Sequence, residues 1–262
     1  MQATSATTGE VHKDRTVLRL TGADRIDFLE GLVTNHVTAT EGLVYAALLT
    51  PQGKYIADFF ILTRKDDVLL DVDTSLAHMA AQRLGIYRLR KDVTIEATDM
   101  IVLRGLDEAP DGALPDPRDP ALGWRAYRDA GSVTDDAPDN AIDWDAIRVA
   151  QTIPETGQEL TPETYILEAG FERLHGVDFR KGCYVGQEVT ARMKHKTELR
   201  KGFVTVELAG TAEPGADIVN EDGKVAGTLH TVAGEKAIAY LRFDWAKGPM
   251  TAGEATVTWK PA

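Results

Sequence analysis

Cys183 is the only cysteine of the chain and lies in the segment RKGCYVGQEVTARMKHK. Two cations, Arg180 and Lys181, precede it, and Gly182 and Gly186 allow close backbone approach or unusual φ values. A helix is predicted to start near Gly186. Because cations and a helix N-terminus favour a thiolate over a thiol, we expect Cys183 to be accessible and reactive as a nucleophile, a redox group or a metal ligand. The alternative is a small buried hydrophobic side chain, the commoner role of a lone cysteine.

The segment around this cysteine is basic, although the protein as a whole is acidic. The chain has 29 Lys and Arg against 41 Asp and Glu, a net charge of -12, which argues against broad contact with nucleic-acid phosphates or an anionic membrane. Residues 180–201 carry seven cations and two acids, a local balance of +5. This contrast suits a small anionic ligand. A solvated surface without any ligand is the alternative.

Other chemical signatures in the sequence are weak. The chain has no G-x-G-x-x-G after a strand, no P-loop and no H-E-x-x-H zinc motif. None of its six histidines lies at metal-ligand spacing from another, so no metal site is predicted. Cysteine-dependent acyl transfer would need a histidine beside Cys183. His175 and His195 are close to it in sequence, but a role as polar loop residues suits them better.

Cysteine use and hydropathy bear on the cellular compartment. One cysteine cannot form a disulfide within the chain, which predicts a reducing, cytoplasmic setting. The longest apolar run, residues 43–49, is too short to cross a bilayer, and the polar N-terminal residues do not form a secretory signal. We therefore expect a cytoplasmic monomer without contact to a membrane or to nucleic acid.

The elements that must position the cysteine segment alternate between strand and helix patterns. Apolar runs between turn residues predict strands at 16–22, 43–49, 55–62, 67–72, 92–97 and 100–105. The turn residues 51–53 join two of them into a hairpin. Helical spacing predicts a helix over 23–33 and another that is capped by Thr74 or Ser75 and runs to about Leu89. This alternation predicts an α+β fold.

Two later stretches connect this body to the rest of the chain. Residues 107–120 contain four prolines and many acids, which predicts a surface loop rather than a core element. A helix is expected over residues 141–151. The positions of this helix that are expected to face the core are Ile142, Ala146, Ile147 and Ala150.

The pattern changes from Gly202 onward to short strands separated by glycine and proline turns, which predicts a small β-barrel or sandwich. We expect an α+β body of two interlaced subdomains over residues 1–199 and a C-terminal β-barrel over residues 200–262. The cysteine segment then lies near the junction of the two, and ligand clefts are common at such junctions.

The stretch KGCYVGQE, Lys181 to Glu188, resembles the signature K-G-C-Y-x-G-Q-E of the YgfZ-like folate-binding proteins. That family is related to the T-protein, the aminomethyltransferase of the glycine cleavage system. The segments LTGADRIDFLEGLVTNHV, AALLTPQGKYIADFFI and GVDFRKGCYVGQEVTAR are similar to the family's N-terminal segment, hairpin and central motif. The resemblance thus covers nearly the whole chain. His36 departs from the pattern, because an aspartate is expected after the preceding Thr-Asn pair.

The resemblance implies a fold of three parts around a central channel that holds tetrahydrofolate, with a C-terminal barrel. It also implies a role in assembly or repair of iron–sulfur clusters in client enzymes, including tRNA-modifying ones, and contact with the assembly machinery. Folate has an aromatic pterin and a glutamate tail, so a basic patch on an acidic protein suits it. With Cys183 as the reactive thiol, the candidate folate contacts are Lys181, Tyr184, Gln187, Glu188 and Arg192.

Two other functions remain open at this point. One is a true folate-dependent aminomethyltransferase, although the glycine-cleavage T-proteins are longer and lack the cysteine signature. The other is a redox scaffold that needs no folate. The residues alone do not decide whether the protein turns over a substrate.

Overall fold

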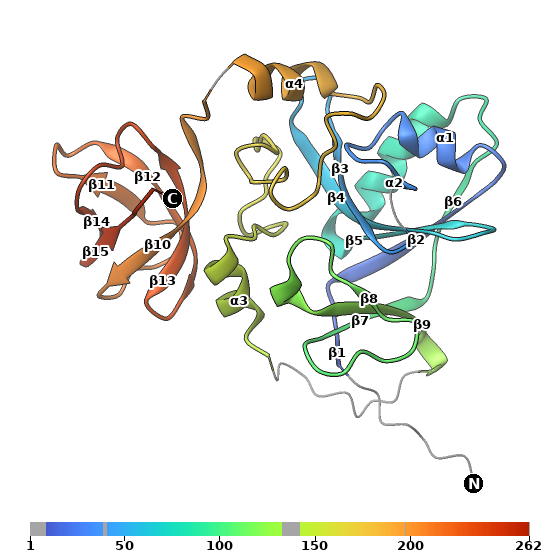
Figure 1. The fold of residues 1–262 in the computed structure, drawn as a ribbon, viewed down its shortest axis with the longest axis horizontal. Helices are drawn as coiled ribbons and strands as arrows, with labels where there is room; N and C mark the ends of the chain where they lie inside the picture. The colour runs from blue at the N-terminus through green and yellow to red at the C-terminus, as the bar shows by residue number, and fades with distance from the viewer. Residues whose placement is uncertain (1–8, 39–40, 133–141, 197, 262) are drawn as a thin grey trace, which may run out of the picture. The chain divides into compact units, whose positions relative to one another are not determined.

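The computed structural model describes residues 9–38, 41–132, 142–196 and 198–261. The chain forms two compact units (Figure 1). The first unit comprises Met1–Gln52, Ile56–Ile142 and Arg173–Gln187, and the second comprises Gly53–Tyr55, Asp143–Glu172 and Glu188–Ala262. The first unit contains two sheets, and the second contains a barrel together with the segments that precede it.

The larger sheet of the first unit has five strands in the order β3-β4-β5-β2-β6. Their bounds are β2 Arg15–Thr21, β3 Val44–Leu49, β4 Tyr55–Thr63, β5 Val68–Asp73 and β6 Thr94–Ala97. Alternate residues of a strand point to opposite faces, so Leu70 and Val72 of β5 join an apolar core on one face while Asp71 lies on the other. This sheet contains the predicted hairpin, and all of its strands were predicted.

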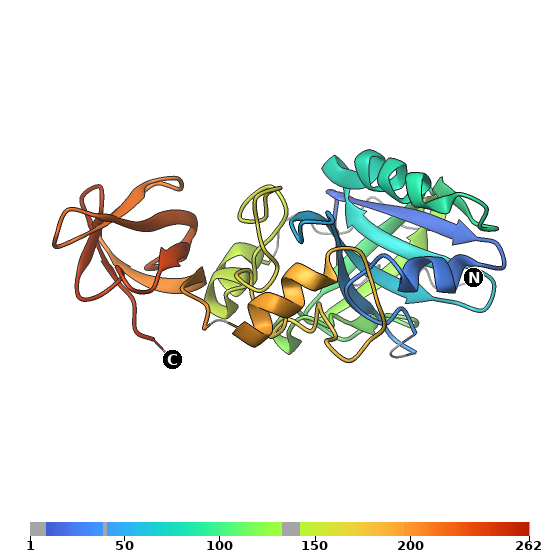
Figure 2. The ribbon, with the colours of Figure 1, turned by 90° about the horizontal axis from the view of Figure 1, so that it is seen from above.

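Helices cover the apolar face of this sheet. They are α1, Arg25–Glu30, and α2, Thr74–Arg88, and both contribute side chains to the same core cluster. Figure 2 shows α2 lying along the sheet. The predicted helix over 23–33 is shorter than expected. The N-cap of α2 is Asp73 rather than the predicted Thr74 or Ser75. The carboxylate of Asp73 accepts a hydrogen bond from the backbone amide of Ser75.

The smaller sheet has the order β1-β7-β9-β8, with β1 Glu10–Val11, β7 Met100–Gly105, β8 Leu114–Pro115 and β9 Trp124–Asp129. The stretch predicted as a surface loop, residues 107–120, therefore contains a strand, and a short 3-10 helix, Pro120–Leu122, follows. Asp116 and Arg118 in this stretch are buried, which contradicts the prediction. They are tolerated there because the Arg118 guanidinium donates to both carboxylate oxygens of Asp116, at 3.0 and 2.9 Å.

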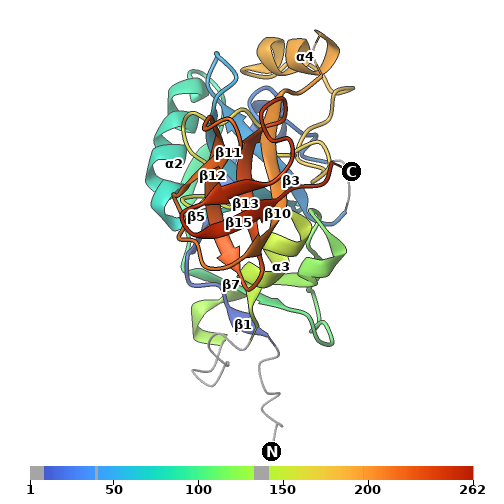
Figure 3. The same cartoon turned by 90° about the vertical axis from the view of Figure 1, so that its left-hand side faces the viewer.

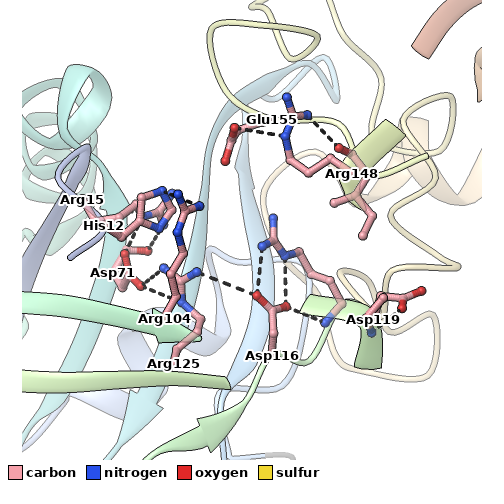
Figure 4. Close-up of polar contacts among 12 residues, drawn as sticks. His12, Arg15, Asp71, Arg104, Asp116, Asp119, Arg125, Arg148 and Glu155 are labelled. Atoms are coloured by element: carbon pink, nitrogen blue, oxygen red, sulfur yellow. Dashed lines mark hydrogen bonds and ion pairs between the residues drawn. The ribbon is translucent and has the colours of Figure 1, made fainter. Parts of the chain in front are cut away.

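A buried network of charges lies on the polar face of the larger sheet (Figure 4). Asp71 is fully buried and accepts hydrogen bonds from Arg15 at 2.5 Å, Arg125 at 2.7 Å and Tyr127 at 3.0 Å. Burial alone would raise the pKa of Asp71, but the positive charges and hydrogen bonds of the two arginines outweigh it and lower that pKa. The nearby His12 has its pKa lowered by burial and by the surrounding arginines, so it is neutral in the folded protein.

In the second unit, helix α3 is Trp144–Gln151. The prediction that Ala150 faces the core is wrong, since it is exposed, and Ala146 and Ile147 are only half-buried. Arg148 is buried instead, because it donates to Glu159 at 3.1 Å and to the carbonyl of Ile153 at 3.0 Å. The predicted Ile142 is also only half-buried, and the buried side chains of the helix are Trp144, Arg148 and Val149.

The C-terminal part of the second unit is a closed barrel with the strand order β10-β13-β12-β11-β14-β15. Figure 3 shows the molecule with these strands facing the viewer. Their bounds are β10 Lys201–Ala209, β11 Asp217–Asn220, β12 Val225–Ala233, β13 Lys236–Arg242, β14 Met250–Ala252 and β15 Ala255–Thr258. The prediction of a small barrel is confirmed. Within the described ranges, no helix is both long and apolar enough to span a membrane.

Candidate thiol site

Two segments that are distant in sequence meet beneath the cysteine loop of the first unit. The hydroxyl of Thr34 donates to the carbonyl of Gly176 at 2.6 Å, and the amide side chain of Asn35 donates to the carbonyl of His175 at 2.7 Å. The backbone amide of Asp178 returns a bond to the carbonyl of Thr34 at 3.0 Å. The Thr-Asn pair thereby clamps the chain as it enters the cysteine loop.

Lys181 fastens the loop to the end of α1. Its ammonium group donates to the carbonyls of Glu30 at 3.0 Å, Val33 at 2.6 Å and Asn35 at 3.0 Å, and its side chain is 1% exposed. Burial lowers the pKa of Lys181, and the Glu30 carboxylate at 3.3 Å opposes that shift. The sequence predicts Lys181 as a cation beside Cys183 and a folate contact. Its donors are instead used by backbone carbonyls, so it acts as an anchor.

Cys183 itself is free and exposed. Lys181 before it and Tyr184 after it are both buried, with the ammonium of Lys181 5.4 Å from the centroid of the tyrosine ring. The loop is thus fixed on both sides while the thiol faces outward. Arg180, the other predicted cation, is 93% exposed. In the described part of the chain, no three His, Cys, Asp or Glu side chains are grouped so as to hold a metal ion.

The backbone turns sharply between the cysteine and the next helix. Gly186 has φ +85°, a conformation that L side chains rarely adopt, so glycine is required there. Gly182 has no such requirement, because a Cβ atom at this position would meet nothing within 4 Å. Helix α4, Gln187–Lys196, starts where predicted, and the side-chain amide of Gln187 donates to the carbonyl of Gly182 at 3.4 Å. Glu188 is exposed on its first turn.

His36 lies between two carboxylates at the position where an aspartate is expected. Its Nδ1 atom is 3.3 Å from Glu30 and its Nε2 atom is 4.0 Å from Asp178. An aspartate here would bring a third carboxylate to the same place, whereas a histidine can bridge the other two. The departure from the family pattern therefore suits its surroundings in this chain.

The second unit contains a pocket of about 700 Å³. Arg192, predicted as a ligand contact, lines it from α4. The hydroxyl of Tyr240 donates to Glu168 at 2.6 Å, and Lys201 lies 3.8 Å from the same carboxylate. Burial and this carboxylate raise the pKa of Tyr240, which keeps its phenol protonated as a donor.

Most residues of this pocket were not predicted. Besides Arg192, its polar and aromatic lining residues are Tyr165, Glu168, Glu198, Arg200, Lys201, Thr228, Tyr240 and Arg242. Arg200 and Lys201 belong to the basic segment, and the charge pattern alone could have indicated them. Tyr165, Glu168 and Tyr240 come from a loop and a barrel strand, so no spacing in the sequence links them.

Comparisons with known proteins first define the class. Residues 200–262 match the family model of the CAF17 C-terminal β-barrel domain. The structure is similar to that of glycine cleavage system aminomethyltransferase T from Bartonella henselae, with a TM-score of 0.75 over 95% of this chain and 83% of that chain. At 12% identity this likeness concerns the fold alone. The predicted α+β, T-protein-like fold with a C-terminal barrel is confirmed.

Sequence relatives define the family more closely. The human mitochondrial iron–sulfur cluster assembly factor IBA57 is 30% identical over 90% of this chain and 78% of its own length. A Mycosarcoma maydis homologue is 32% identical over 76% of this chain, and the match spans 57% of that protein. The chain belongs to the IBA57 family of iron–sulfur cluster assembly factors. The predicted link to cluster assembly is thereby confirmed at the family level.

The predicted cytoplasmic location is wrong by the same comparison. The human, mouse and Mycosarcoma maydis relatives are all named as mitochondrial proteins. The prediction rested on the use of a single cysteine. Low cysteine content argues against structural disulfides, but it does not distinguish one reducing compartment from another.

Proposed function

We propose that this chain is a tetrahydrofolate-binding accessory protein that supports assembly or repair of iron–sulfur clusters in client enzymes, with Cys183 as its reactive thiol. The observation that carries the proposal is the exposed thiol on a loop that Lys181 and the Thr34–Asn35 pair hold in place. Cysteine thiolates are the usual protein ligands of iron–sulfur clusters. A thiol at the surface is within reach of a cluster, or of a sulfur atom, that a partner protein carries.

The anchoring of the loop explains how the thiol is presented. Lys181 donates hydrogen bonds to the backbone carbonyls of Glu30, Val33 and Asn35, and Thr34 donates one to the carbonyl of Gly176. Because these bonds form before any partner arrives, ordering the loop adds little cost to the encounter. Cys183 is therefore the ligand or nucleophile, whereas Lys181 is a positioning residue.

The pocket of the second unit supports the folate part of the proposal. Tyr165 and Tyr240 offer aromatic walls to a pterin or aminobenzoyl ring, and Glu168 offers an acceptor for ring N–H groups. Arg192 and Arg200 offer positive charge to a glutamate tail. This combination of flat apolar surface and cations matches the two halves of folate chemically.

The proposed clients include tRNA-modifying iron–sulfur enzymes. This part of the proposal rests on the resemblance of the motif KGCYVGQE to the YgfZ-like signature. It predicts that cells without the chain lose tRNA thiolation together with the activity of other iron–sulfur enzymes. Normal thiolation in such cells would remove these clients from the proposal.

Complementation tests the role of the thiol. In cells that lack their own copy, wild type should restore iron–sulfur enzyme activity and Cys183→Ser should not. Because the thiol is exposed, the variant should fold with an unchanged melting temperature. Rescue by Cys183→Ser would refute the assignment of the thiol.

Titration with tetrahydrofolate tests the pocket separately, because the four tryptophans supply a fluorescence signal. Arg192→Ala/Arg200→Ala should bind more weakly than wild type, and Lys224→Ala, an exposed cation outside the pocket, should bind equally well. If the double variant lost folate but still rescued cells, the redox scaffold without folate would replace our proposal. Release of an aminomethyl product with tetrahydrofolate would instead favour an aminomethyltransferase.

A further inference from the structure

Helix α2 carries apolar side chains on both of its faces. The inner face buries Ala80 and Leu84 in the core of the first unit. On the outer face Met79 and Ile86 are 38% and 64% exposed, and Leu89, the residue after the helix, is 88% exposed. These three are among only five large hydrophobic side chains exposed in the described residues, and they fall within eleven positions. Such concentration is typical of a contact surface rather than of scattered surface residues.

The same stretch is strongly basic. Residues 79–91, here called the α2 ridge, contain Arg83, Arg88, Arg90 and Lys91 and no acidic residue, a charge of +4 in a chain of -12. None of these four cations forms an ion pair with an acidic side chain of the described residues, and Arg88 donates to the carbonyl of Val93 at 3.4 Å. With 41 acids in the chain, cations left unpaired around exposed apolar groups are available to an outside partner.

A shallow, open pocket lies at the end of the ridge. The amide of Lys91 donates to the carbonyl of Arg88 at 2.8 Å and closes a tight turn. Leu89 adopts φ 45° and ψ -107° in this turn, a positive-φ conformation that favours glycine and strains leucine. Residues 87–91 line a pocket of about 760 Å³ beside it. The fold thus holds a large apolar side chain in solvent at a backbone position where glycine would be easier to accommodate.

We propose that the α2 ridge is the docking surface for an acidic protein that places an apolar side chain in the pocket of residues 87–91 and pairs its carboxylates with the surrounding cations. Charge complementarity selects an acidic partner. The concavity favours a protein over a membrane, because a protein side chain fills a pocket whereas a bilayer presents a broad fluid surface. The inference does not depend on Cys183 or on folate.

Leu89 separates a docking role from a folding role. If this residue only supported the fold, Leu89→Gly would lower the melting temperature. An exposed leucine in a strained turn contributes no core packing, so we expect the glycine variant to melt at the same temperature or higher. Its binding to the partner should nevertheless weaken at least fivefold, because the apolar contact is lost.

The first step of the test is crosslinking in cells that carry the full-length chain in place of their own copy. A photoreactive phenylalanine at Ile86 should yield one discrete adduct with a protein of acidic surface. The same group at Leu106, which is 45% exposed elsewhere on the first unit, should not yield it. Adducts only with lipid, only with a second copy of the chain, or equally from both positions would overturn the proposal.

The second step measures binding of the purified captured protein to the purified full-length chain. Arg83→Glu/Arg90→Glu should raise the dissociation constant at least tenfold and more at low salt, since each change reverses a charge. Lys65→Glu, an exposed cation outside the ridge, is the matched control and should leave binding within twofold. If neither the charge reversals nor Leu89→Gly changed the dissociation constant, the assignment of the ridge as the docking surface would be overturned, whatever the partner is.

Discussion

At the residue scale, Lys181 and Cys183 are two positions apart and face opposite ways. The lysine ammonium satisfies carbonyls at and beyond the end of α1, where backbone acceptors lack helical partners. The thiol projects outward from the same loop. Lys181 holds the loop in place, and Cys183 is the thiol to which we assign the chemistry, so substitutions at the two positions should have different effects.

Replacement of Lys181 by methionine should lower the free energy of unfolding by about 2–4 kcal/mol, because one buried and two partly buried carbonyls lose a charged donor. Arg180→Met is the matched control. That side chain is 93% exposed, so its removal should change stability by less than about 0.5 kcal/mol. Urea unfolding of both variants gives the comparison. Equal losses would contradict the anchoring role of Lys181.

At the element scale, the stretch 107–120 shows how an acidic, proline-rich sequence can enter the interior. Asp116 holds Arg118 through two hydrogen bonds and lies 3.8 Å from Arg125 of β9. Arg118 in turn stacks over Phe60, with 4.7 Å from its guanidinium carbon to the ring centroid. A single carboxylate therefore connects this loop to two neighbouring strands.

Removal of that carboxylate in Asp116→Ala should destabilise the protein by about 3–5 kcal/mol, because the buried guanidinium of Arg118 loses the carboxylate that accepts two of its hydrogen bonds. Asp111→Ala removes an exposed carboxylate from the same loop and should cost less than about 0.5 kcal/mol. Denaturant unfolding of both variants compares them. A loss of unfolding free energy as small as that of the control would contradict the prediction, and it would mean that water takes the place of the Asp116 carboxylate beside Arg118.

The element scale also explains what the sequence could predict. Strands, the hairpin and the barrel follow local rules, since alternation and turn residues act between near neighbours, and these predictions are confirmed. Arg148 is buried because it pairs with Glu159, and Asp116 is buried because it pairs with Arg118. The periodicity of a sequence does not show which charged side chains form such pairs in the folded protein. For the same reason the sequence indicated Lys181 only as a cation beside Cys183, and not as a donor to the carbonyls of Glu30, Val33 and Asn35. The exposure of Cys183 was predicted from residues adjacent to it in sequence, and this prediction is confirmed.

At the scale of the whole molecule, the excess of negative charge bears on the folate binding that we propose. A chain of net charge -12 repels an anionic tail except near its basic segment. We therefore expect polyglutamyl tetrahydrofolate to bind more tightly than the monoglutamyl form at low salt, with the advantage shrinking as salt screens the charges. A single change such as Arg192→Ala should weaken binding by less than about tenfold, because one exposed contact is worth about 0.2–1 kcal/mol. Titrations at two salt concentrations would measure this, and equal affinities at low salt would refute it.

The two units should also respond differently to acid. The folded first unit keeps His12 neutral, because burial and the nearby arginines lower its pKa, whereas the unfolded chain takes up a proton at this histidine below about pH 6.5. The unfolded state then binds more protons, so stability falls as the pH drops, by roughly 1.4 kcal/mol per pH unit, or about 2 kcal/mol between pH 6.5 and 5. The lowered pKa of Asp71 adds to this only below about pH 4, where that carboxylate begins to take up protons in the unfolded chain.

The tryptophans allow each unit to be followed alone. Trp124 is buried in the first unit, and Trp144, Trp245 and Trp259 lie in the second. With the latter three changed to phenylalanine, Trp124 fluorescence in urea should report the acid-dependent loss, and His12→Gln should abolish most of it. With Trp124 changed to phenylalanine instead, the fluorescence of the second unit should depend less on pH over the same interval. Equal pH slopes for wild type and His12→Gln would show that the ring becomes protonated without unfolding, which the four arginines that lower its pKa argue against.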